Sequence, residues 1–400
     1  MKSILLLLFC CGSILFVSGC WDRVELNDLA IVTAAAIDIK GEKEIELSLQ
    51  IFIPKALSSG GGQGGGGGGG GSAGEGGITL VASQKGANIA DALSKLQGEV
   101  PRKIFWGQCK VFIFGETLAK KGIQEPMDFL LRHPQPRERA YMYVSRGKAK
   151  HVLELTPELE RYSGEVIREL SDLHIGMQVT MQDLDKMLIG KAQAAAIPYV
   201  KVLSAEQGQE KPFQFPKIDG TAVFKKDRMV GKINEKETRG VLWLRNEMEE
   251  YTVTVNPQDA KGDVSLNPVS AQIKLIPRIQ GEKWKMLVKV NTEGAVVQNR
   301  TNLNLTNNEV IKKVEKAYGK DIQNRIDLAI QKAQHELKAD ILGFAKEFHR
   351  KYPKQWKQVE NRWDEVFPEV EVKIDVEAHI RRQGYINKPG GLLEEEVKEK

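Results

Sequence analysis

The N-terminal segment that closes with Val17-Ser18-Gly19-Cys20 sets the conditions under which the rest of this chain must fold. Lys2 is its one charged residue, and a run of apolar and small residues follows from position 4 to 17. A helix needs about 20 apolar residues to span a bilayer, so this shorter run indicates a secretory signal over residues 1–19. The chain after it is therefore expected to fold on the extracytoplasmic side.

Cys20 is the predicted lipidation site. An aliphatic residue, two small residues and a Cys stand in the order that lipoprotein signal peptidase recognises, which gives Val17, Ser18 and Gly19 the role of recognition residues. Only a thiolate is nucleophilic enough to accept a diacylglyceryl group as a thioether. The alternative is that Cys20 is one more apolar residue at the end of an ordinary signal. We predict that Cys20 begins the mature chain and carries membrane lipid.

The cysteines exclude a disulfide-stabilised fold. Cys10 and Cys11 lie in the predicted signal and Cys20 carries lipid, so Cys109 remains alone. An exported chain with one remaining Cys has no intramolecular disulfide and must be held together by its hydrophobic cores. Cys109 precedes a strand-like run, and this setting is more typical of a small buried apolar residue than of a reactive thiol.

Charge and length restrict the class of protein. Removal of residues 1–19 takes away Lys2 and lowers the formal net charge from +5 to +4, in a chain rich in both signs. This balance indicates a solvated surface and gives no argument for nucleic acid as a partner. The chain is long enough for two or three domains. It has no second long apolar run, so we expect attachment to the membrane by lipid alone.

Hydrophobic periodicity predicts an N-terminal α+β domain over residues 20–150. Residues 29–39 form a continuous small and apolar run, typical of a buried strand, and residues 44–53 alternate apolar and polar, typical of a half-buried strand of the same sheet. Asn88 is placed to cap a helix. The remaining predicted elements are strands at 78–83, 110–114 and 140–145 and helices at 89–97, 116–121 and 126–131.

Residues 60–77 are almost all Gly. No Lys-Ser or Lys-Thr follows, so the tract does not match a phosphate-binding loop. Its composition predicts a disordered connector. Because predicted strands lie on both sides of it, we expect a long loop within one sheet.

The second half of the chain predicts a mostly helical middle region, 151–205, and a C-terminal α+β domain, 206–385. Helices are expected at 158–173 and 181–188, with the helical region ending at Ile197-Pro198-Tyr199. A hairpin at 218–233 and a helix at 238–245 follow. Further strands are expected at 251–255, 264–276, 284–290 and 370–380, and a disordered tail at 386–400.

A long amphipathic segment is expected to dominate the C-terminal domain. Thr306 to Glu309 has the spacing of a capping box. The apolar residues from Tyr318 to Phe348 recur at intervals nearer 3.6 than 3.5 residues. This period favours a helix lying along a sheet, with Gly319 as a candidate break, over a coiled-coil dimer. The predicted fold class is multi-domain α+β, with mixed and antiparallel sheets covered by packed helices.

Motifs for catalysis, metals or cofactors are missing. The six His residues never stand at zinc-ligand spacing, and His335-Glu336 lacks the second His of a metalloprotease motif. No G-x-S-x-G nucleophile elbow occurs. The lone His174 is expected to be a packed residue. The sequence therefore predicts a protein that is not an enzyme, with no catalytic residue, metal site or cofactor.

One dense basic run lies in the N-terminal half. Facing anionic lipid headgroups is one role for it. In the alternative interpretation, its cations are solvated or paired with nearby acidic residues. The run consists of Arg132, Arg137, Arg139, Arg146, Lys148 and Lys150.

Several segments together resemble the Ger(x)C lipoproteins, the C subunits of spore germinant receptors. The resemblance is carried by Cys20-Trp21-Asp22, by ELND at 25–28, PRKIFWG at 101–107 and FGETLAKKG at 114–122, and by Arg132 with Arg137. The stretch from Ile218 through Leu244 is similar to the C-terminal region of that family. Family members usually have His after the Gly at position 107. This chain has Gln108, so no role is transferred to that position.

The resemblance implies a lipid-anchored, non-catalytic subunit of a nutrient germinant receptor that acts in spore germination. Its implied partners are integral membrane subunits, one A-type and one transporter-like B-type, together with membrane lipid through Cys20. The implied location is the extracytoplasmic face of the cell membrane, which in the spore is the inner membrane. An extracytoplasmic solute-binding lipoprotein is the alternative, although βαβ runs would then be expected in place of meanders and hairpins. An envelope hydrolase is a third class and lacks its motifs.

Overall fold

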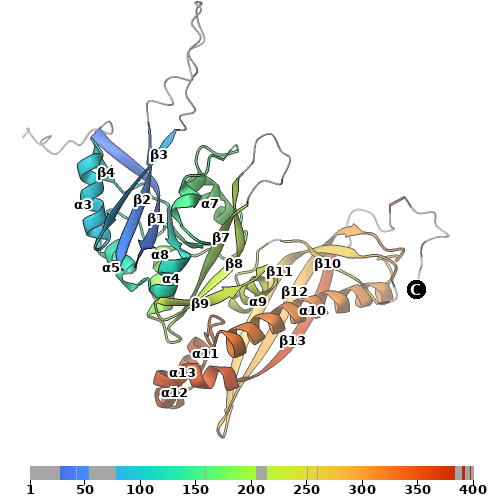
Figure 1. The fold of residues 1–400 in the computed structure, drawn as a ribbon. Coiled ribbons are helices and arrows are strands. Elements are labelled where there is room, and N and C mark those ends of the chain that lie inside the picture. The colour runs from blue at the N-terminus through green and yellow to red at the C-terminus, as the bar shows by residue number, and fades with distance from the viewer. Residues whose placement is uncertain are drawn as a thin grey trace, which may run out of the picture.

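The computed structural model describes residues 28–41, 43–53, 78–157, 159–203, 214–249, 251–258, 260–382, 390, 391 and 397. These residues form two sheets, each covered by helices (Figure 1). The predicted fold class, α+β with mixed sheets, is confirmed. Residues 1–20, the whole Gly tract 60–77 and most of the tail lie outside the described residues.

The first sheet has nine strands in the order β3-β2-β1-β5-β6-β7-β8-β9, with β4 paired to β1. Its centre, β1-β5-β6-β7, is parallel, and both flanks are antiparallel. Strands β2 and β3 pair directly, which confirms that the Gly tract joins two strands of one sheet. The strands are β1 Leu29–Lys40, β2 Glu44–Phe52, β3 Thr79–Gly86, β4 Lys103–Phe105, β5 Val111–Gly115, β6 Tyr141–Ser145, β7 Ala194–Leu203, β8 Phe215–Lys225 and β9 Arg228–Ile233.

Helices cover both faces of this sheet. One face packs against α3 (Ile89–Glu99), α4 (Glu116–Lys121), α5 (Gln124–Arg132) and α8 (Met181–Leu188). The other packs against α6 (Lys150–Leu153) and α7 (Ser163–Asp172) around a smaller core. The predicted cap is present, because the Asn88 side chain accepts a hydrogen bond from the Asp91 backbone N–H at 2.9 Å.

The second covered face corrects the prediction that β2 is half-buried. Its polar residues Ser48 and Gln50 are also buried, because α6 and α7 lie over them. Gln50 Nε2 donates to the Leu153 carbonyl at 3.1 Å and to Ser163 Oγ at 3.0 Å. Hydrogen bonds to those helices thus satisfy Gln50, and Ser83 of β3 donates to Ser48 at 2.8 Å, although the alternation had placed both side chains in water.

Strand β7 corrects the prediction that the helical region extends to Tyr199. Residues 194–200 are buried and form a strand between β6 and β8. A short apolar run has no period that separates a buried strand from a buried helix, so the sequence pattern could not decide. The predicted hairpin is confirmed as β8 and β9, and it extends the first sheet across the predicted boundary between residues 205 and 206.

The second sheet has the order β10-β11-β12-β13, antiparallel except for the parallel pair β12-β13. Its strands are β10 Val253–Val255, β11 Val264–Gln280, β12 Lys283–Asn299 and β13 Glu371–Arg382. The predicted long helix is α10, Asn308–Gln331, and it lies along this sheet (Figure 1). Val314, Tyr318, Ile322 and Ile326 are fully buried, which confirms that the 3.6-residue period marks its packed face.

The amphipathic segment breaks at a different place from the one predicted. Helix α10 continues through Gly319 and ends in a π-turn, Lys332–Glu336. The chain then turns at Lys338 (φ 48°) and Gly343 (φ 89°), and α11, Phe344–Lys351, begins. The short helices α12 (Pro353–Val359) and α13 (Trp363–Val366) follow, each ending in a 3₁₀ turn.

Helix α9, Glu235–Arg245, joins the chain of the first sheet to the second and crosses α10 at Gly240. An added Cβ at Gly240 would lie 2.1 Å from the Arg325 carbonyl oxygen and 2.7 Å from Ala329 Cβ, so the crossing requires Gly. The helix begins at Asn234, which forms a capping box with Glu237. That start lies three residues before the predicted one.

Candidate functional site

The predicted lipidation residue Cys20 and its recognition residues Val17, Ser18 and Gly19 lie outside the described residues. The structure describes where the chain leads from them. Strand β1 starts at Leu29, opposite Lys103 of β4, and the adjacent Ile53 N–H donates to the Ile78 carbonyl at 2.8 Å. We call this end, where β1 and β4 begin and β2 ends, the leading end of the first sheet; it includes the start of β5, which pairs with β1 from Ala34 onward. Its opposite is the far end.

The predicted basic run does not form one surface. Arg137 and Arg139 precede β6 and lie at the leading end, whereas Arg146, Lys148 and Lys150 follow β6 and lie at the far end. The length of a five-residue strand, about 17 Å, separates the two groups. Arg132 pairs with Asp128 at 2.6 Å and Lys150 with Glu154 at 3.5 Å, so part of the run is paired.

Two further cations belong with the leading end and were missed by the sequence reasoning. Lys103 opens β4, and Lys110 directly precedes β5. Both side chains are exposed. Both residues precede strands that run parallel to β1, Lys103 level with Leu29 and Lys110 next to Thr33, so they lie on the side of the sheet where β1 begins. The predicted basic run instead grouped cations that are close together in the sequence.

Cys109 is buried, in agreement with the prediction of a small apolar residue. Its thiol is in contact with the Val111 carbonyl at 3.5 Å. Burial raises the pKa of Cys109, so the nucleophilic thiolate is strongly disfavoured. The neighbouring Gln108, at the position where the resembling family usually has His, is exposed.

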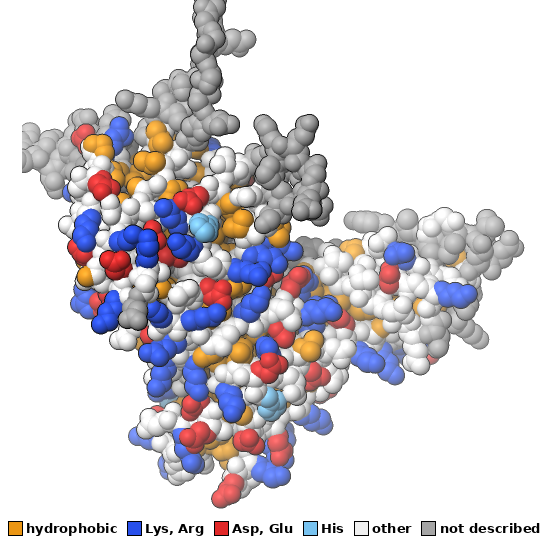
Figure 2. All heavy atoms as spheres, in the orientation of Figure 1, with side chains coloured by type: hydrophobic (Ala, Val, Ile, Leu, Met, Phe, Trp, Pro, Cys, Tyr) orange, Lys and Arg blue, Asp and Glu red, His pale blue; other side chains and the backbone are white. Residues whose placement is uncertain are grey.

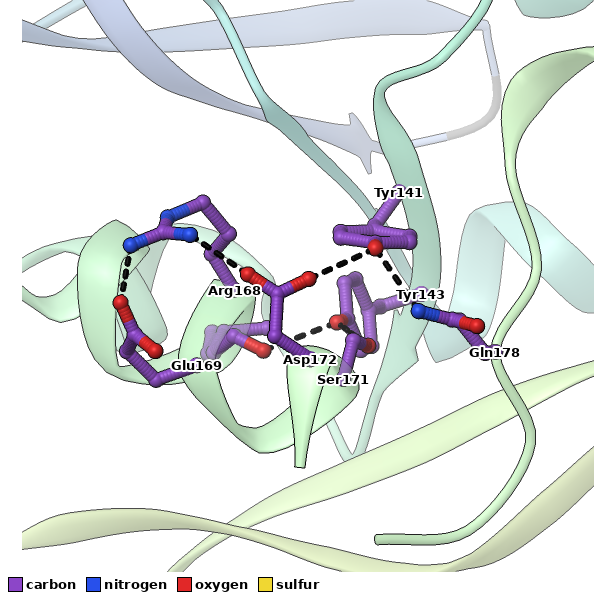
Figure 3. Close-up of polar contacts among 8 residues, drawn as sticks. Tyr141, Tyr143, Arg168, Glu169, Ser171, Asp172 and Gln178 are labelled. Atoms are coloured by element: carbon purple, nitrogen blue, oxygen red, sulfur yellow. Dashed lines mark hydrogen bonds and ion pairs between the residues drawn. The ribbon is translucent and has the colours of Figure 1, made fainter. Parts of the chain in front are cut away.

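A polar cluster joins α7 to β6 (Figure 3). Tyr141 OH donates to Asp172 Oδ1 at 2.7 Å and accepts from Gln178 Nε2 at 2.8 Å. The buried Tyr143 OH donates to the Ile167 carbonyl at 2.9 Å and contacts Ser171 Oγ. Burial raises the pKa of both Tyr hydroxyls, and Asp172 adds to the effect at Tyr141.

Arg168 completes this cluster by an ion pair of 2.5 Å with Asp172 and another with Glu169. The side chains of the cluster are thus bonded to one another. Its role is to fix α7 against the sheet. His174, just after α7, is exposed with a left-handed backbone (φ 55°), so the expectation of a packed His was wrong.

A cleft of about 890 Å³ lies between the two sheets. It is open, and its lining combines residues of α8, α9, β11 and α11. Arg245 pairs with Glu247 at 2.9 Å and Arg350 pairs with Glu347, so much of its charge is internally balanced. Figure 2 likewise shows Lys and Arg mixed with Asp and Glu over the face in view. The cleft brings together no pair of catalytic groups.

Asp340, at one wall of this cleft, is the most deeply buried carboxylate of the C-terminal half. Its Oδ1 accepts from the backbone N–H groups of residues 342, 343 and 344 at 3.1–3.2 Å. Its Oδ2 accepts from Ala345 N at 2.6 Å and from Trp363 Nε1 at 3.0 Å. Burial raises the pKa of Asp340, and these donors oppose that effect. The Asp340 carboxylate therefore caps α11 and links it to the indole of Trp363.

The described residues contain neither a candidate metal site nor a candidate membrane-spanning helix. Within the described residues, no three His, Cys, Asp or Glu side chains come together as a metal site would require. In the same part of the chain, every helix is too short or too polar to cross a bilayer.

Two sequence models of one protein family match the chain. The model described as "Spore germination protein N-terminal domain" matches residues 22–202, and "Spore germination B3/ GerAC like, C-terminal" matches residues 219–384. Spore germination protein KC of Bacillus subtilis (strain 168) is 29% identical over 94% of this chain and 95% of its own. The putative spore germination protein YfkR of that strain is 29% identical over 97% of each chain.

A solved structure shows the same fold. The crystal structure of the GerBC protein superimposes with a TM-score of 0.54 over 90% of this chain and all of its own, at 18% identity. Spore germination protein GerQC of Bacillus cereus is 22% identical over 92% of this chain and 96% of its own.

Proposed function

Since this chain belongs to the GerAC-like family of spore germination proteins, we propose that it is a lipid-anchored, non-catalytic subunit of a nutrient germinant receptor. In this proposal Cys20 carries a diacylglyceryl group. The folded chain then stands on the extracytoplasmic face of the spore inner membrane, where it assembles with an A-type and a transporter-like B-type integral membrane subunit. The observation that carries the proposal is the match of both family models along the chain, which begins two residues after Cys20.

Three features of the molecule support a structural role for this subunit. Two of its buried polar groups, Gln50 and Asp340, cap helices or join elements. The cleft between its two sheets has no Ser, Thr, Tyr, His or Cys among its described lining residues. Its one described Cys is buried with a raised pKa. A subunit of this kind contributes surfaces for assembly and catalyses no reaction itself.

Replacement of Cys20 by Ala is expected to abolish lipid attachment and the response to germinant. Two acyl chains hold a protein stably on a bilayer, whereas a surface contact alone does not. The measurement is the amount of the variant in membrane fractions of spores, together with the germination rate after nutrient addition. Normal membrane abundance with an unchanged nutrient response would contradict the proposal. A Cys109→Ala variant is the matched control and is expected to keep both properties, because that thiol is buried and unmodified.

Assembly with membrane subunits is expected to be detectable by co-purification. An affinity-tagged chain extracted from spore membranes in mild detergent should carry at least one multi-spanning protein in fixed ratio. Deletion of the chain should remove the response to its nutrients while germination triggered chemically downstream of receptors proceeds. Recovery of the chain alone, from spores in which those nutrients still act, would exclude the receptor-subunit role.

A further inference from the structure

We propose that the leading end of the first sheet is a membrane-contacting surface, in which Lys103, Lys110, Arg137 and Arg139 bind the phosphate groups of anionic lipids. The proposal deepens the function proposed above, because it rests on anchoring at Cys20. It concerns which surface of the folded chain then faces the bilayer, and which lipids that surface prefers.

Chain length places this end near the membrane. Residues 21–28 are the eight residues between the predicted lipid site and the first residue of β1. Even fully extended, they span at most about 30 Å, at about 3.3–3.6 Å per residue. Leu29 is level with Lys103 of β4, so the leading end is the part of the sheet to which the anchor is tied.

The four cations are available for an external anion. All four are exposed, and within the described residues no ion pair involves any of them. Arg137 is brought toward β4, because Gln135 of the same loop accepts a hydrogen bond from Trp106 N at 3.2 Å. The exposed carboxylates next to these segments are Asp28, Glu99 and Glu138, three against the four cations. Positive charge therefore prevails at this end.

Apolar side chains accompany these cations. Ile53 and Ile78 are joined by their backbones at the same edge, and Phe52 lies one residue further into the sheet. All three are only partly buried, and Leu80, on the edge strand β3, is 53% exposed. Cations beside partly exposed aliphatic and aromatic groups are the combination found at lipid headgroup level.

The far end provides a matched comparison on the same sheet. Lys40 is the last residue of β1, and Arg146, Lys148 and Lys150 follow β6. Together they carry the same total charge as the four cations of the leading end, although Lys150 pairs with Glu154. The tether at Leu29 keeps them the length of the sheet further from the bilayer. If net charge alone caused lipid binding, both sets would contribute equally. If the leading end is the contact, only the first set matters.

The test uses the mature lipidated chain in vesicles and a single fluorescent label. Cys20 carries lipid and Cys109 is buried, so an introduced Cys is the reactive thiol. The label is placed either at the leading end (Gln108→Cys) or in the turn at the far end (Lys43→Cys), both exposed positions. Vesicles of phosphatidylcholine alone are compared with vesicles containing one-third phosphatidylglycerol. Energy transfer to a headgroup-labelled lipid reports proximity to the bilayer.

Transfer from position 108 is expected to rise in the anionic vesicles and to return to the neutral level near 1 M salt, where the screening length is about 3 Å. Transfer from position 43 is expected to stay low. Changing Lys103, Lys110, Arg137 and Arg139 to Gln should shift the docked-to-undocked ratio at least tenfold, since one cation near an anionic surface is worth about fivefold. Changing the four far-end cations to Gln should leave it unchanged.

Equal transfer from position 108 in neutral and anionic vesicles, or equal effects of the two fourfold variants, would overturn the proposal. Failure of the lipid anchor would give a different result. The chain without substitutions would then fail to float with neutral vesicles in high salt. In that case flotation of the two fourfold variants on anionic vesicles still decides the present proposal. Circular dichroism of both variants establishes that these exposed substitutions leave the fold intact.

Discussion

Replacing Asp340 by Asn is expected to lower the free energy of unfolding of the C-terminal half by about 3 kcal/mol. The carboxylate accepts five N–H groups, four from the start of α11 and one from Trp363. The Asn side chain has the same shape, but an NH₂ group replaces one of the two carboxylate oxygens. That NH₂ group then faces N–H donors instead of accepting from them. At least one buried N–H then loses its partner, and the cost is that of an unsatisfied buried polar group. The aromatic cluster around Trp363, which includes Trp284, Phe348 and Trp356, should loosen with it.

Native-state hydrogen exchange at residues 342–345 measures this effect directly, because those amides donate to Asp340. Their protection should fall about 100-fold, since each factor of ten in exchange corresponds to about 1.4 kcal/mol. The control is Asp375→Asn on β13, where the side chain is half exposed, and a change within about 0.5 kcal/mol is expected there. Equal protection of the α11 amides in both variants would show that the Asp340 carboxylate does not hold this helix.

Replacing Gly240 by Ala is expected to destabilise the protein by about 2 kcal/mol, although Ala favours a helix by about 1 kcal/mol over Gly. The new methyl group would meet the Arg325 carbonyl oxygen and Ala329 Cβ at distances that no Cβ can tolerate. Backbone atoms cannot rotate out of the way as a flexible side chain can, so α9 and α10 must separate. The midpoint of thermal unfolding is the measurement, with exchange protection of the Trp243 amide as a local report.

Gly319→Ala in α10 is the matched control. There the added Cβ would lie 3.6 Å from Ala378 Cβ and 3.7 Å from Val376 Cγ1, which are ordinary contacts. The helix preference of Ala should therefore prevail, and stability should rise by about 0.5–1 kcal/mol. If both variants moved the unfolding midpoint in the same direction, close approach at Gly240 would not explain its presence.

Patterns that concern one element were readable from the sequence. The alternation in residues 44–53 predicted β2, the run at 29–39 predicted β1, and the 3.6-residue period predicted the buried face of α10. Each depends on side-chain direction within a single element. The same reasoning placed Cys109 in a core, because small apolar residues next to an apolar strand are normally buried.

What escaped the sequence depends on a second element at a distance along the chain. The burial of Gln50 follows from α6 and α7, more than 100 residues away. The need for Gly at position 240 follows from α10, and the strand character of 194–203 follows from its pairing with β6 and β8. The leading-end cations show the same limit. Density along the chain grouped Arg137 with Lys150, whereas strand direction places Arg137 before β6 and Lys150 after it.

The pairing of β7 with β8 has a consequence for how this gene can recombine with its relatives. The segment between Leu203 and Phe215 contains the predicted boundary between two regions and so suggests a crossover point. A crossover there would nevertheless separate the paired strands β7 and β8. In the recombinant, β7, a strand buried over residues 194–200, would come from one parent and its partner β8 from the other. Parts from two parents would have to be mutually complementary along that whole strand. A junction after Ile233, where β9 gives way to the Asn234 cap of α9, leaves every strand of the first sheet with its own parental neighbour.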